Sequence, residues 1–325
     1  MGHFIVTGCA GYIGRCLIRR LAILFKKPII GIDNLRYGQP APNLPFGDFQ
    51  FREMDVVDYF HAATEAELRG AEAIFHLAAI VGAPACDADP VEAERVNVIS
   101  THAMLSALAA RNITSPMLIY PNTNSMYGSL AGVCTEETEG KPLSLYARTK
   151  IRAEDGIREC YPNHCIFRLA TAFGLSPRMR RDLLVNDFVW RARHEGRIEV
   201  YDPGAMRNYI FVDDICEAFA FAVLNWERCR GQIFNLGHDG LNMTKLELAN
   251  TVASLHERCE VIVCEGSDPD KRDCRVSSAK LRSVGFNARI EVAGFRNILA
   301  DIDGYYAVAL AASWMTNLHP VRRKS

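Results

Sequence analysis

A tyrosine and a lysine stand four positions apart in the segment LYARTKIRAE, residues 145–154. Residues at this spacing lie on one face of a helix, so Tyr146 and Lys150 would be neighbours there. A tyrosine, whose ordinary pKa is about 10, needs a nearby positive charge before its phenolate can act as a base near neutral pH. The spacing therefore indicates either a proton-transfer pair or an exposed helical tyrosine and lysine without a chemical role.

Three glycines in the segment VTGCAGYIG supply a second chemical signal. They follow an apolar run of strand length, residues 3–8, and open a segment with helical periodicity, residues 12–25. Glycines at such a turn let the backbone approach a pyrophosphate, and the N-terminus of the helix attracts its negative charge. The residues predicted to form this dinucleotide site are Gly8, Gly11, Tyr12, Ile13 and Gly14.

Asp33 ends the next apolar run, KPIIGID, and lies 19 residues after Gly14. A carboxylate at this place bonds the adenosine ribose hydroxyls and repels a 2′-phosphate, which favours NAD over NADP. The alternative interpretation of Asp33 is a turn-forming aspartate, and the nearby Arg36 weakens the preference for NAD. Further cofactor contacts are expected from residues at the ends of the second, third and fourth strands: Asn34, Asp55, Val56, Leu77, Ala78 and Ala79.

Strand-length apolar runs alternate with helical segments through the first half of the chain. This alternation predicts an α/β fold with a Rossmann-type doubly wound parallel sheet and a smaller, interleaved C-terminal substrate-binding region. We expect an NAD-binding domain at 1–174, to which core elements return at about 205–237. The smaller region would comprise 175–204 and 238–325. His76, at the end of the fourth strand, is interpreted as a packed core histidine rather than a catalytic one.

The bulk composition is that of an ordinary globular protein. Of the 325 residues, 49% are hydrophobic and 23% are charged. The formal net charge is -1 and the sequence has no long run of charges of one sign, so the charge pattern does not indicate binding to nucleic acid or to a membrane surface. The apolar N-terminus is broken by glycines and lacks a basic leader, so a cytoplasmic location is expected. The eleven cysteines form no CxxC motif, and no metal site is expected.

The chain resembles the extended short-chain dehydrogenase/reductases in a set of motifs that occur in the same order. These motifs are the GxxGxxG array, Asp33, HLAA, the SMYG turn, YxxxK and RNYIFVDD. The closest type is the NAD-dependent nucleotide-sugar epimerase/dehydratase group, and the resemblance covers about residues 3–285. It implies an enzyme with a catalytic centre of Thr123, Tyr146 and Lys150. Tyr146 would take the proton of the sugar C4 hydroxyl while hydride passes to the nicotinamide, and Lys150 would also hold the nicotinamide ribose. Asn97 matches a cofactor-binding asparagine, although a buried structural asparagine is an equal alternative.

The resemblance also implies a nucleotide-diphosphate sugar as the substrate. Arg207 matches the phosphate-binding arginine of the family, and Arg272 and Asn186 are further candidates, with ordinary surface residues as the alternative for all three. The remaining residues expected to contact the substrate are Val81, Gly82, Asn124, Ser125 and Thr171. The run SPRMRRD contains Arg178, Arg180 and Arg181 and is expected to be a solvated loop or a mobile lid.

Departures from the family pattern narrow the chemistry. Sugar 4,6-dehydratases carry an Asp-Glu pair where this chain has Asn124 and Ser125, and UDP-glucuronate decarboxylases carry a glutamate at the second position. Thr171 and Phe211 stand where many members have asparagine and histidine. The leading hypothesis is therefore a nucleotide-sugar 4-epimerase. The alternatives are a 4-dehydrogenase that releases a 4-keto sugar, another dehydratase or reductase of the family, and a non-catalytic NAD sensor. A homodimer formed through helices at about 90–111 and 146–160 is expected.

Overall fold

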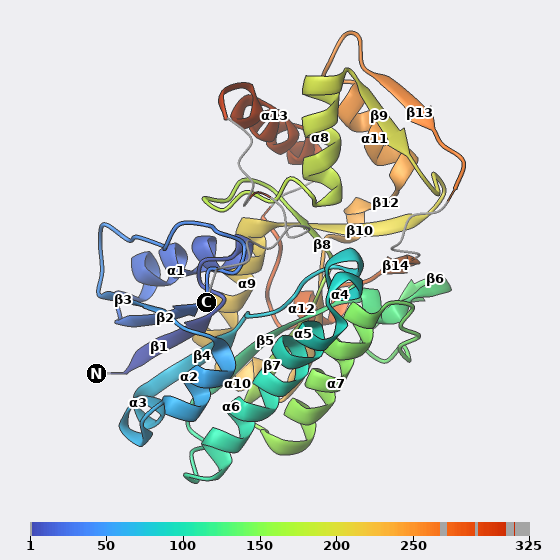
Figure 1. Cartoon of the computed structure of the whole chain (residues 1–325). Helices are drawn as coiled ribbons and strands as arrows, with labels where there is room; N and C mark the ends of the chain where they lie inside the picture. The colour runs from blue at the N-terminus through green and yellow to red at the C-terminus, as the bar shows by residue number, and fades with distance from the viewer. Residues whose placement is uncertain (1, 267–271, 290–291, 310–314, 316–325) are drawn as a thin grey trace.

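The computed structural model describes residues 2–266, 272–289, 292–309 and 315 (Figure 1). Within these ranges the largest sheet has seven parallel strands in the order β11-β7-β5-β4-β1-β2-β3. Its strands are β1 (His3–Thr7), β2 (Ile29–Asp33), β3 (Phe49–Glu53), β4 (Ala71–His76), β5 (Met117–Thr123), β7 (His164–Leu169) and β11 (Gln232–Leu236). The order reverses between β1 and β4, as in a doubly wound fold, so the predicted fold class is confirmed.

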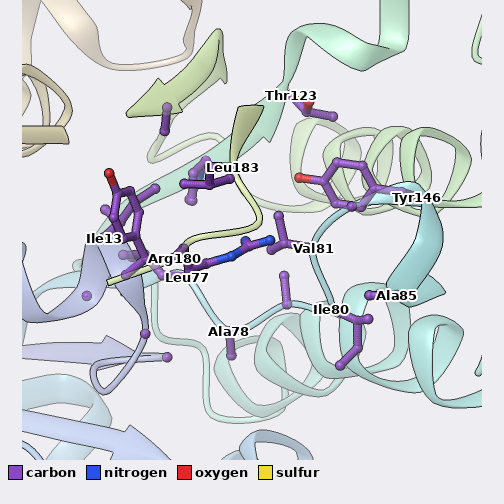
Figure 2. A pocket seen from close by; sticks show the side chains of 18 of the residues that line it. Ile13, Leu77, Ala78, Ile80, Val81, Ala85, Thr123, Tyr146, Arg180 and Leu183 are labelled. Atoms are coloured by element: carbon purple, nitrogen blue, oxygen red, sulfur yellow. The ribbon is translucent and has the colours of Figure 1, made fainter. Parts of the chain in front are cut away.

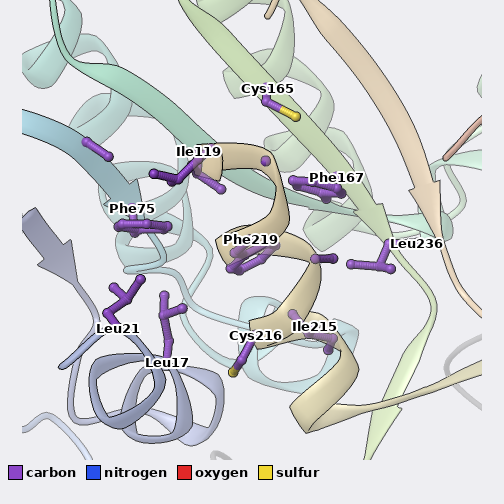
Figure 3. Packing of buried hydrophobic residues seen from close by; sticks show 14 of the residues in the cluster. Leu17, Leu21, Phe75, Ile119, Cys165, Phe167, Ile215, Cys216, Phe219 and Leu236 are labelled. Atoms are coloured by element: carbon purple, nitrogen blue, oxygen red, sulfur yellow. The ribbon is translucent and has the colours of Figure 1, made fainter. Parts of the chain in front are cut away.

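Helices cover both faces of this sheet (Figure 1). One face carries α1 (Tyr12–Phe25) and α9 (Val212–Leu224), whose apolar sides pack with β1, β4 and β7 in a core that includes Leu17, Phe75 and Phe219 (Figure 3). The other face carries α2 (Val56–Ala62), α3 (Glu65–Gly70), α6 (Ser100–Ala109) and α7 (Leu145–Cys160). Because the strands are buried on both faces, they read in the sequence as nearly continuous apolar runs.

The segment before β5 contains a local irregularity that the sequence did not predict. A single amphipathic helix was expected over 90–112, and the structure has α5 (Pro90–Glu94), a π-helical turn η1 (Arg95–Ile99) and α6, preceded by α4 (Ala83–Ala88). A π turn inserts one extra residue into the helical repeat and is frequent next to functional sites. Here it places Asn97 beneath the chain that follows β4.

Smaller sheets lie beside the carboxyl ends of the large one (Figure 1). Their strands are β8 (Thr171–Phe173), β10 (Met206–Phe211) and β12 (Asn242–Thr244), then β9 (Arg197–Val200) with β13 (Glu260–Val263), and β6 (Ser129–Cys134) with β14 (Asp273–Val276). The accompanying helices are α8 (Leu184–Glu195), α10 (Trp226–Cys229), α11 (Lys245–Ala253), α12 (Ala279–Ser283) and α13 (Val292–Val308), with short 3₁₀ turns η2 (Asn124–Tyr127) and η3 (Asp239–Leu241).

The large sheet and the smaller region share elements from distant parts of the chain. Leu281 of α12 and Phe286 pack into the core beneath the large sheet, although both fall within 238–325. Conversely, β8 falls within 1–174 and pairs with β10 of the smaller sheet. Within the described ranges, no helix combines the length and the apolarity that a bilayer crossing requires.

Candidate active site

A cavity of about 460 Å³ opens at the carboxyl ends of β1, β2, β4 and β5, beneath the smaller region. Ligands of doubly wound sheets bind at this edge. In Figure 2 the Tyr146 hydroxyl points into the cavity, with Thr123 above it and Val81 below. The sequence-predicted residues that line it are Gly8, Gly11, Tyr12, Ile13, Gly14, Asp33, Asn34, Asp55, Val56, Leu77, Ala78, Ala79, Val81, Gly82, Thr123, Ser125, Tyr146, Lys150, Thr171, Arg207 and Arg272.

The glycine turn between β1 and α1 is too closely packed for side chains. Gly8 has φ of 69°, in the left-handed region that favours glycine, and a Cβ there would lie 2.8 Å from the backbone nitrogen of Ala78. A Cβ on Gly14 would lie 2.2 Å from the carbonyl oxygen of Gly8. Gly11 caps α1 without a side chain, so the first N–H groups of this helix are open to an anion. The turn therefore fits a dinucleotide diphosphate.

A change of Gly14 to alanine is expected to destabilise the protein by about 1–3 kcal/mol, as overpacking of a filled site does. It should also weaken dinucleotide binding, because the added methyl group pushes the Gly8 carbonyl and the turn out of place. Denaturant unfolding and calorimetric titration with NAD measure the two effects. Gly304→Ala is the matched control, since a Cβ there meets nothing within 4 Å. Equal behaviour of the two variants would contradict the tight packing of the turn.

Asp33 is tied to the glycine turn at one end of the cavity. Its carboxylate accepts hydrogen bonds from the backbone nitrogens of Ala10 (3.0 Å) and Leu35 (2.8 Å). Burial raises the pKa of Asp33, and these backbone bonds oppose the rise. The nearby Arg36 donates to Glu92 (2.9 Å) and Asp89 (3.2 Å), so its charge is paired with two carboxylates.

Asp55 also lines this end of the cavity, where its carboxylate already has several partners. It caps α2 by accepting from the backbone nitrogen of Val57 at 2.9 Å. Arg95, from the π turn, donates to its two oxygens at 2.8 and 2.6 Å. The contact between Asp55 and an adenine stays a prediction.

The Tyr146–Lys150 pair lies at the other end of the cavity. The Ser144 hydroxyl caps α7 by accepting from the Ala147 nitrogen at 3.2 Å, which places Tyr146 in the first turn and Lys150 in the next. Lys150 is 3% exposed, and its Nζ lies 3.9 Å from the centre of the Tyr120 ring. Burial lowers the pKa of Lys150 to about 7 and raises that of Tyr146 to about 12, a rise that a hydrogen bond with Thr123 opposes.

A buried ion pair behind this centre was not foreseen from the sequence. Arg168 of β7 binds Glu154 at 2.6 Å, and both side chains are almost fully buried. Glu154 lies one helical turn after Lys150, and its negative charge opposes the lowering of the Lys150 pKa. Asn122 donates to Glu154 and accepts from the backbone nitrogen of Thr123 at 2.8 Å. The network therefore joins the end of β5 to α7, the two elements that carry the catalytic candidates.

Two arginines on the small sheets form the wall where a substrate diphosphate is expected. Arg207 of β10 is 3% exposed, and Arg272, just before β14, donates to the Thr171 hydroxyl at 3.4 Å. The Asp273 carboxylate accepts from the backbone nitrogen of Met206 at 2.9 Å, which holds β14 beside β10. Guanidinium groups are suited to bidentate phosphate binding, so this wall can hold an anionic substrate group.

The expectation of a solvated loop at SPRMRRD is wrong for two of its arginines. Arg178 and Arg180 are 2% and 7% exposed and line the cavity. Asp182 pairs with Arg180, with 3.1 Å between Nε and Oδ1, and Arg178 lies over the Tyr37 ring. Arg181 is different, because its guanidinium stacks on Trp190 at 4.4 Å and is not among the cavity residues. The charge-rich composition suggested solvent, whereas these side chains turn inward.

Three candidate asparagines, Asn97, Asn124 and Asn186, are not among the residues that line the cavity. Asn97 donates to the Ile80 carbonyl at 3.0 Å and accepts from the Ile80 nitrogen at 2.8 Å, as in the structural alternative. Asn186 of α8 accepts from Gly174 at 3.2 Å and donates to the Arg180 carbonyl at 2.9 Å. Asn124 begins the 3₁₀ turn η2 after β5, where it is 3% exposed, and its amide has no hydrogen-bond partner among the described residues.

His76 is a packed core residue, as the sequence suggested. Its ring nitrogens lie 3.0 Å from the Thr7 hydroxyl and 3.2 Å from the Ser100 hydroxyl, and burial lowers its pKa to about 3. It is not among the residues that line the cavity. Across the described ranges, His, Cys, Asp and Glu side chains do not gather in threes as a metal ion would require.

The doubly wound sheet, the glycine turn at the start of α1 and the Tyr146–Lys150 pair in the same cavity define an enzyme of the extended short-chain dehydrogenase/reductase class. The model of the NAD dependent epimerase/dehydratase family matches residues 4–237. The chain therefore belongs to this family, whose name gives NAD as the cofactor.

Individual relatives show several activities within the family. A UDP-glucose 4-epimerase of Mycolicibacterium smegmatis is 31% identical over 262 residues, which are 77% of this chain and 81% of that protein. A dTDP-glucose 4,6-dehydratase of Neisseria gonorrhoeae is 24% identical over 86% of this chain and 89% of its own length. The fold matches the Thermus thermophilus UDP-glucose 4-epimerase in complex with NAD, with a TM-score of 0.79, 22% identity and coverage of 95% and 100%.

Proposed function

We propose that this protein is an NAD-dependent nucleotide-sugar 4-epimerase. The observation that carries the proposal is that one cavity brings together the glycine turn, the Tyr146–Lys150 pair and the two arginines Arg207 and Arg272. These features correspond to a cofactor site, a proton-transfer site and a diphosphate site. The mycobacterial relative, which bears the name UDP-glucose 4-epimerase, supports the same reaction class.

The residues at the Asp33 end of the cavity fit NAD. The bare N-terminus of α1 would hold the diphosphate, and Asp33, fixed by Ala10 and Leu35, would accept hydrogen bonds from the adenosine ribose. Arg36, a nearby cation that could attract a 2′-phosphate, is paired with Asp89 and Glu92. This pairing supports NAD rather than NADP. When bound, NAD supplies the acceptor for the hydride of C4.

At the Tyr146 end of the cavity, side chains of this protein would move the proton of the C4 hydroxyl. Tyr146, as phenolate, would take the proton of the C4 hydroxyl, and the Lys150 ammonium group one turn later would stabilise that phenolate. Thr123, whose hydroxyl donates to Ser125 at 3.0 Å, lies in the same cavity and would orient the C4 oxygen. Tyr146 would then return the proton to the C4 oxygen, and inversion at C4 requires that the hydride be returned to the opposite face of the 4-keto sugar.

The acidic groups in the cavity favour epimerisation over elimination of water. In the described part of the chain the carboxylates that line it are Asp33, Asp55, Asp182 and Asp187. None of them belongs to the turn after Thr123, where Asn124 and Ser125 stand. An amide and a hydroxyl there cannot act as the acid and base of a dehydratase. A 4-dehydrogenase uses the same centre and remains the second candidate.

The fate of the cofactor separates these two candidates. An epimerase returns the hydride to the sugar, so NADH is not expected to accumulate during turnover, whereas a dehydrogenase forms one NADH for each 4-keto sugar. Absorbance of NADH during turnover with a nucleotide sugar measures this difference. Accumulation of NADH in proportion to product would contradict the 4-epimerase and favour the dehydrogenase.

Arg207→Ala is expected to raise KM for the nucleotide sugar by one to two orders of magnitude, because a charged hydrogen bond contributes roughly 1.5–3 kcal/mol. The change of kcat should be smaller, since Arg207 lies on the diphosphate wall rather than beside Tyr146. Steady-state kinetics measure both. Arg275→Ala, an exposed arginine of β14, is the matched control. An unchanged KM for Arg207→Ala would mean that the diphosphate is held elsewhere.

The proposal includes a homodimer and a cytoplasmic location. The helices expected at the dimer interface, α6 and α7, pack side by side on the outer face of the large sheet (Figure 1). On the π turn before α6, Ile99 is 46% exposed, which suits an apolar contact with a second copy. Light scattering of the purified protein measures the oligomeric state.

A further inference from the structure

The segment that carries Arg178 and Arg180 is bonded directly to the glycine turn. The hydroxyl of Tyr12, the first residue of α1, donates to the Gly174 carbonyl at 2.7 Å. In return, the Ser176 hydroxyl donates to the Tyr12 carbonyl at 2.7 Å and accepts from the Arg178 nitrogen at 3.2 Å. Residues 174–178 therefore lie against the start of α1, next to the glycine turn.

Both arginines extend from this segment along the cofactor end of the cavity. Arg178 lies 5.3 Å from the centre of the ring of Tyr37, a few residues beyond Asp33. Arg180 reaches across the cavity between Leu77 and Val81, toward the side where the Tyr146 hydroxyl lies (Figure 2). The two guanidinium groups thus lie one after the other between the Asp33 end and the Tyr146 end of the cavity. An extended dinucleotide would lie along the same line.

The electrostatics of this wall favour an anionic ligand. Burial lowers the pKa of Arg178 to about 10, and the like charge of Arg180 adds to this effect. Asp182 holds Arg180 through Nε and Nη2, which fixes the direction of its guanidinium. Two guanidinium charges brought out of water are costly unless anions accompany them. Asp182 supplies one such anion to Arg180, and a diphosphate would supply further negative charge to this pair of guanidinium groups.

We propose that Arg178 and Arg180 form the second wall of the dinucleotide site and donate to the cofactor phosphates from the side opposite the glycine turn. This inference rests on the proposed NAD site. A substrate phosphate is the less favoured ligand, because the substrate arginines Arg207 and Arg272 come from the small sheets, whereas Arg178 lies beside Tyr37 at the adenosine end.

One consequence concerns the retention of the cofactor. With phosphates held between α1 and residues 174–180, release of the dinucleotide requires the two hydrogen bonds of Tyr12 to open. The cofactor is then retained between turnovers, which suits an enzyme that regenerates it in every cycle.

The test is calorimetric titration of Arg178→Met and Arg180→Met, each stripped of cofactor, with NAD, ADP-ribose, adenosine and UDP. We expect roughly 10- to 100-fold weaker binding of NAD and ADP-ribose, as for loss of a charged hydrogen bond. Adenosine, which has no phosphate, should bind as it does to the wild type. Arg181→Met is the matched control, because its guanidinium stacks on Trp190 and is outside the cavity.

Each other outcome has a defined meaning. Wild-type affinity of both variants for NAD would overturn the inference, and so would a selective loss of affinity for UDP with NAD binding unchanged, which would assign the arginines to the substrate. Failure of the wild type itself to bind NAD would instead overturn the proposed function. Arg178→Lys and Arg180→Lys, which keep the charge, replace the methionine variants if circular dichroism shows that those do not fold, with the same expected loss of the bidentate contact.

Discussion

Tyr146→Phe is expected to lower kcat by about 10²–10⁴-fold, the contribution typical of a positioned acid or base. The substitution removes the hydroxyl oxygen that points into the cavity and keeps the aromatic ring in the first turn of α7. NAD affinity should stay close to the wild-type value, because the glycine turn and Asp33 are at the other end of the cavity. Steady-state kinetics and calorimetric titration with NAD measure the two quantities.

Tyr305→Phe is the control for this variant, because Tyr305 is a partly buried tyrosine of α13 that does not line the cavity. It should keep wild-type activity. If Tyr146→Phe also kept wild-type turnover, Tyr146 could not be the base. If it lost NAD binding along with activity, the loss of turnover would say nothing about proton transfer, and Tyr146 would be a cofactor contact.

Lys150→Met is expected to move the pH dependence of kcat/KM. In the wild type, the Tyr146–Lys150 pair loses its first proton as the pH passes the Lys150 pKa of about 7. One proton then remains on the pair, and the active form is the one in which Lys150 holds this proton and Tyr146 is a phenolate. The wild-type rate should therefore rise as the pH passes about 7. Without the lysine, only the Tyr146 hydroxyl, with a pKa of about 12, remains to lose a proton.

The acidic limb of the Lys150→Met profile should consequently move from about 7 toward the Tyr146 pKa of about 12. The rate at pH 7 should fall by about 10–1000-fold, because the loss of one nearby charge changes the pKa of the phenolate by about 1–3 units. The pH profile of kcat/KM, measured with a nucleotide sugar, reports this shift. The exposed Lys141→Met variant should keep the wild-type profile. A lower rate without any shift of the limb would contradict the electrostatic role and leave Lys150 as a cofactor contact.

The sequence predicted those parts of the site whose residues lie close together in the chain and within one turn, strand or helix. The glycines must follow the first strand, and Tyr146 and Lys150 must share one face of α7, so their positions follow from the neighbouring residues alone. Asp33 follows in the same way from the end of β2. The sheet itself was predictable because each of its strands is a nearly continuous apolar run.

The parts that were missed depend on contacts between distant segments. Glu154 and Arg168 pair between α7 and β7, and only the turn-length spacing of Glu154 from Lys150 could have hinted at the network. Arg178 and Arg180 were expected in solvent because composition alone cannot show that Tyr12 draws their segment over the cavity. For Asn97 the sequence left a cofactor contact and a structural role open, and only the fold shows that its amide bonds the backbone of Ile80.

The central claim is tested most directly by proton NMR of the protein incubated with NAD and a panel of UDP-, GDP-, CDP- and dTDP-sugars, with Tyr146→Phe run beside the wild type. The proposed function predicts a new sugar with an inverted C4 signal in one member of the panel, absent from the Tyr146→Phe sample and without accumulation of NADH. A 4-keto sugar formed together with stoichiometric NADH would contradict it.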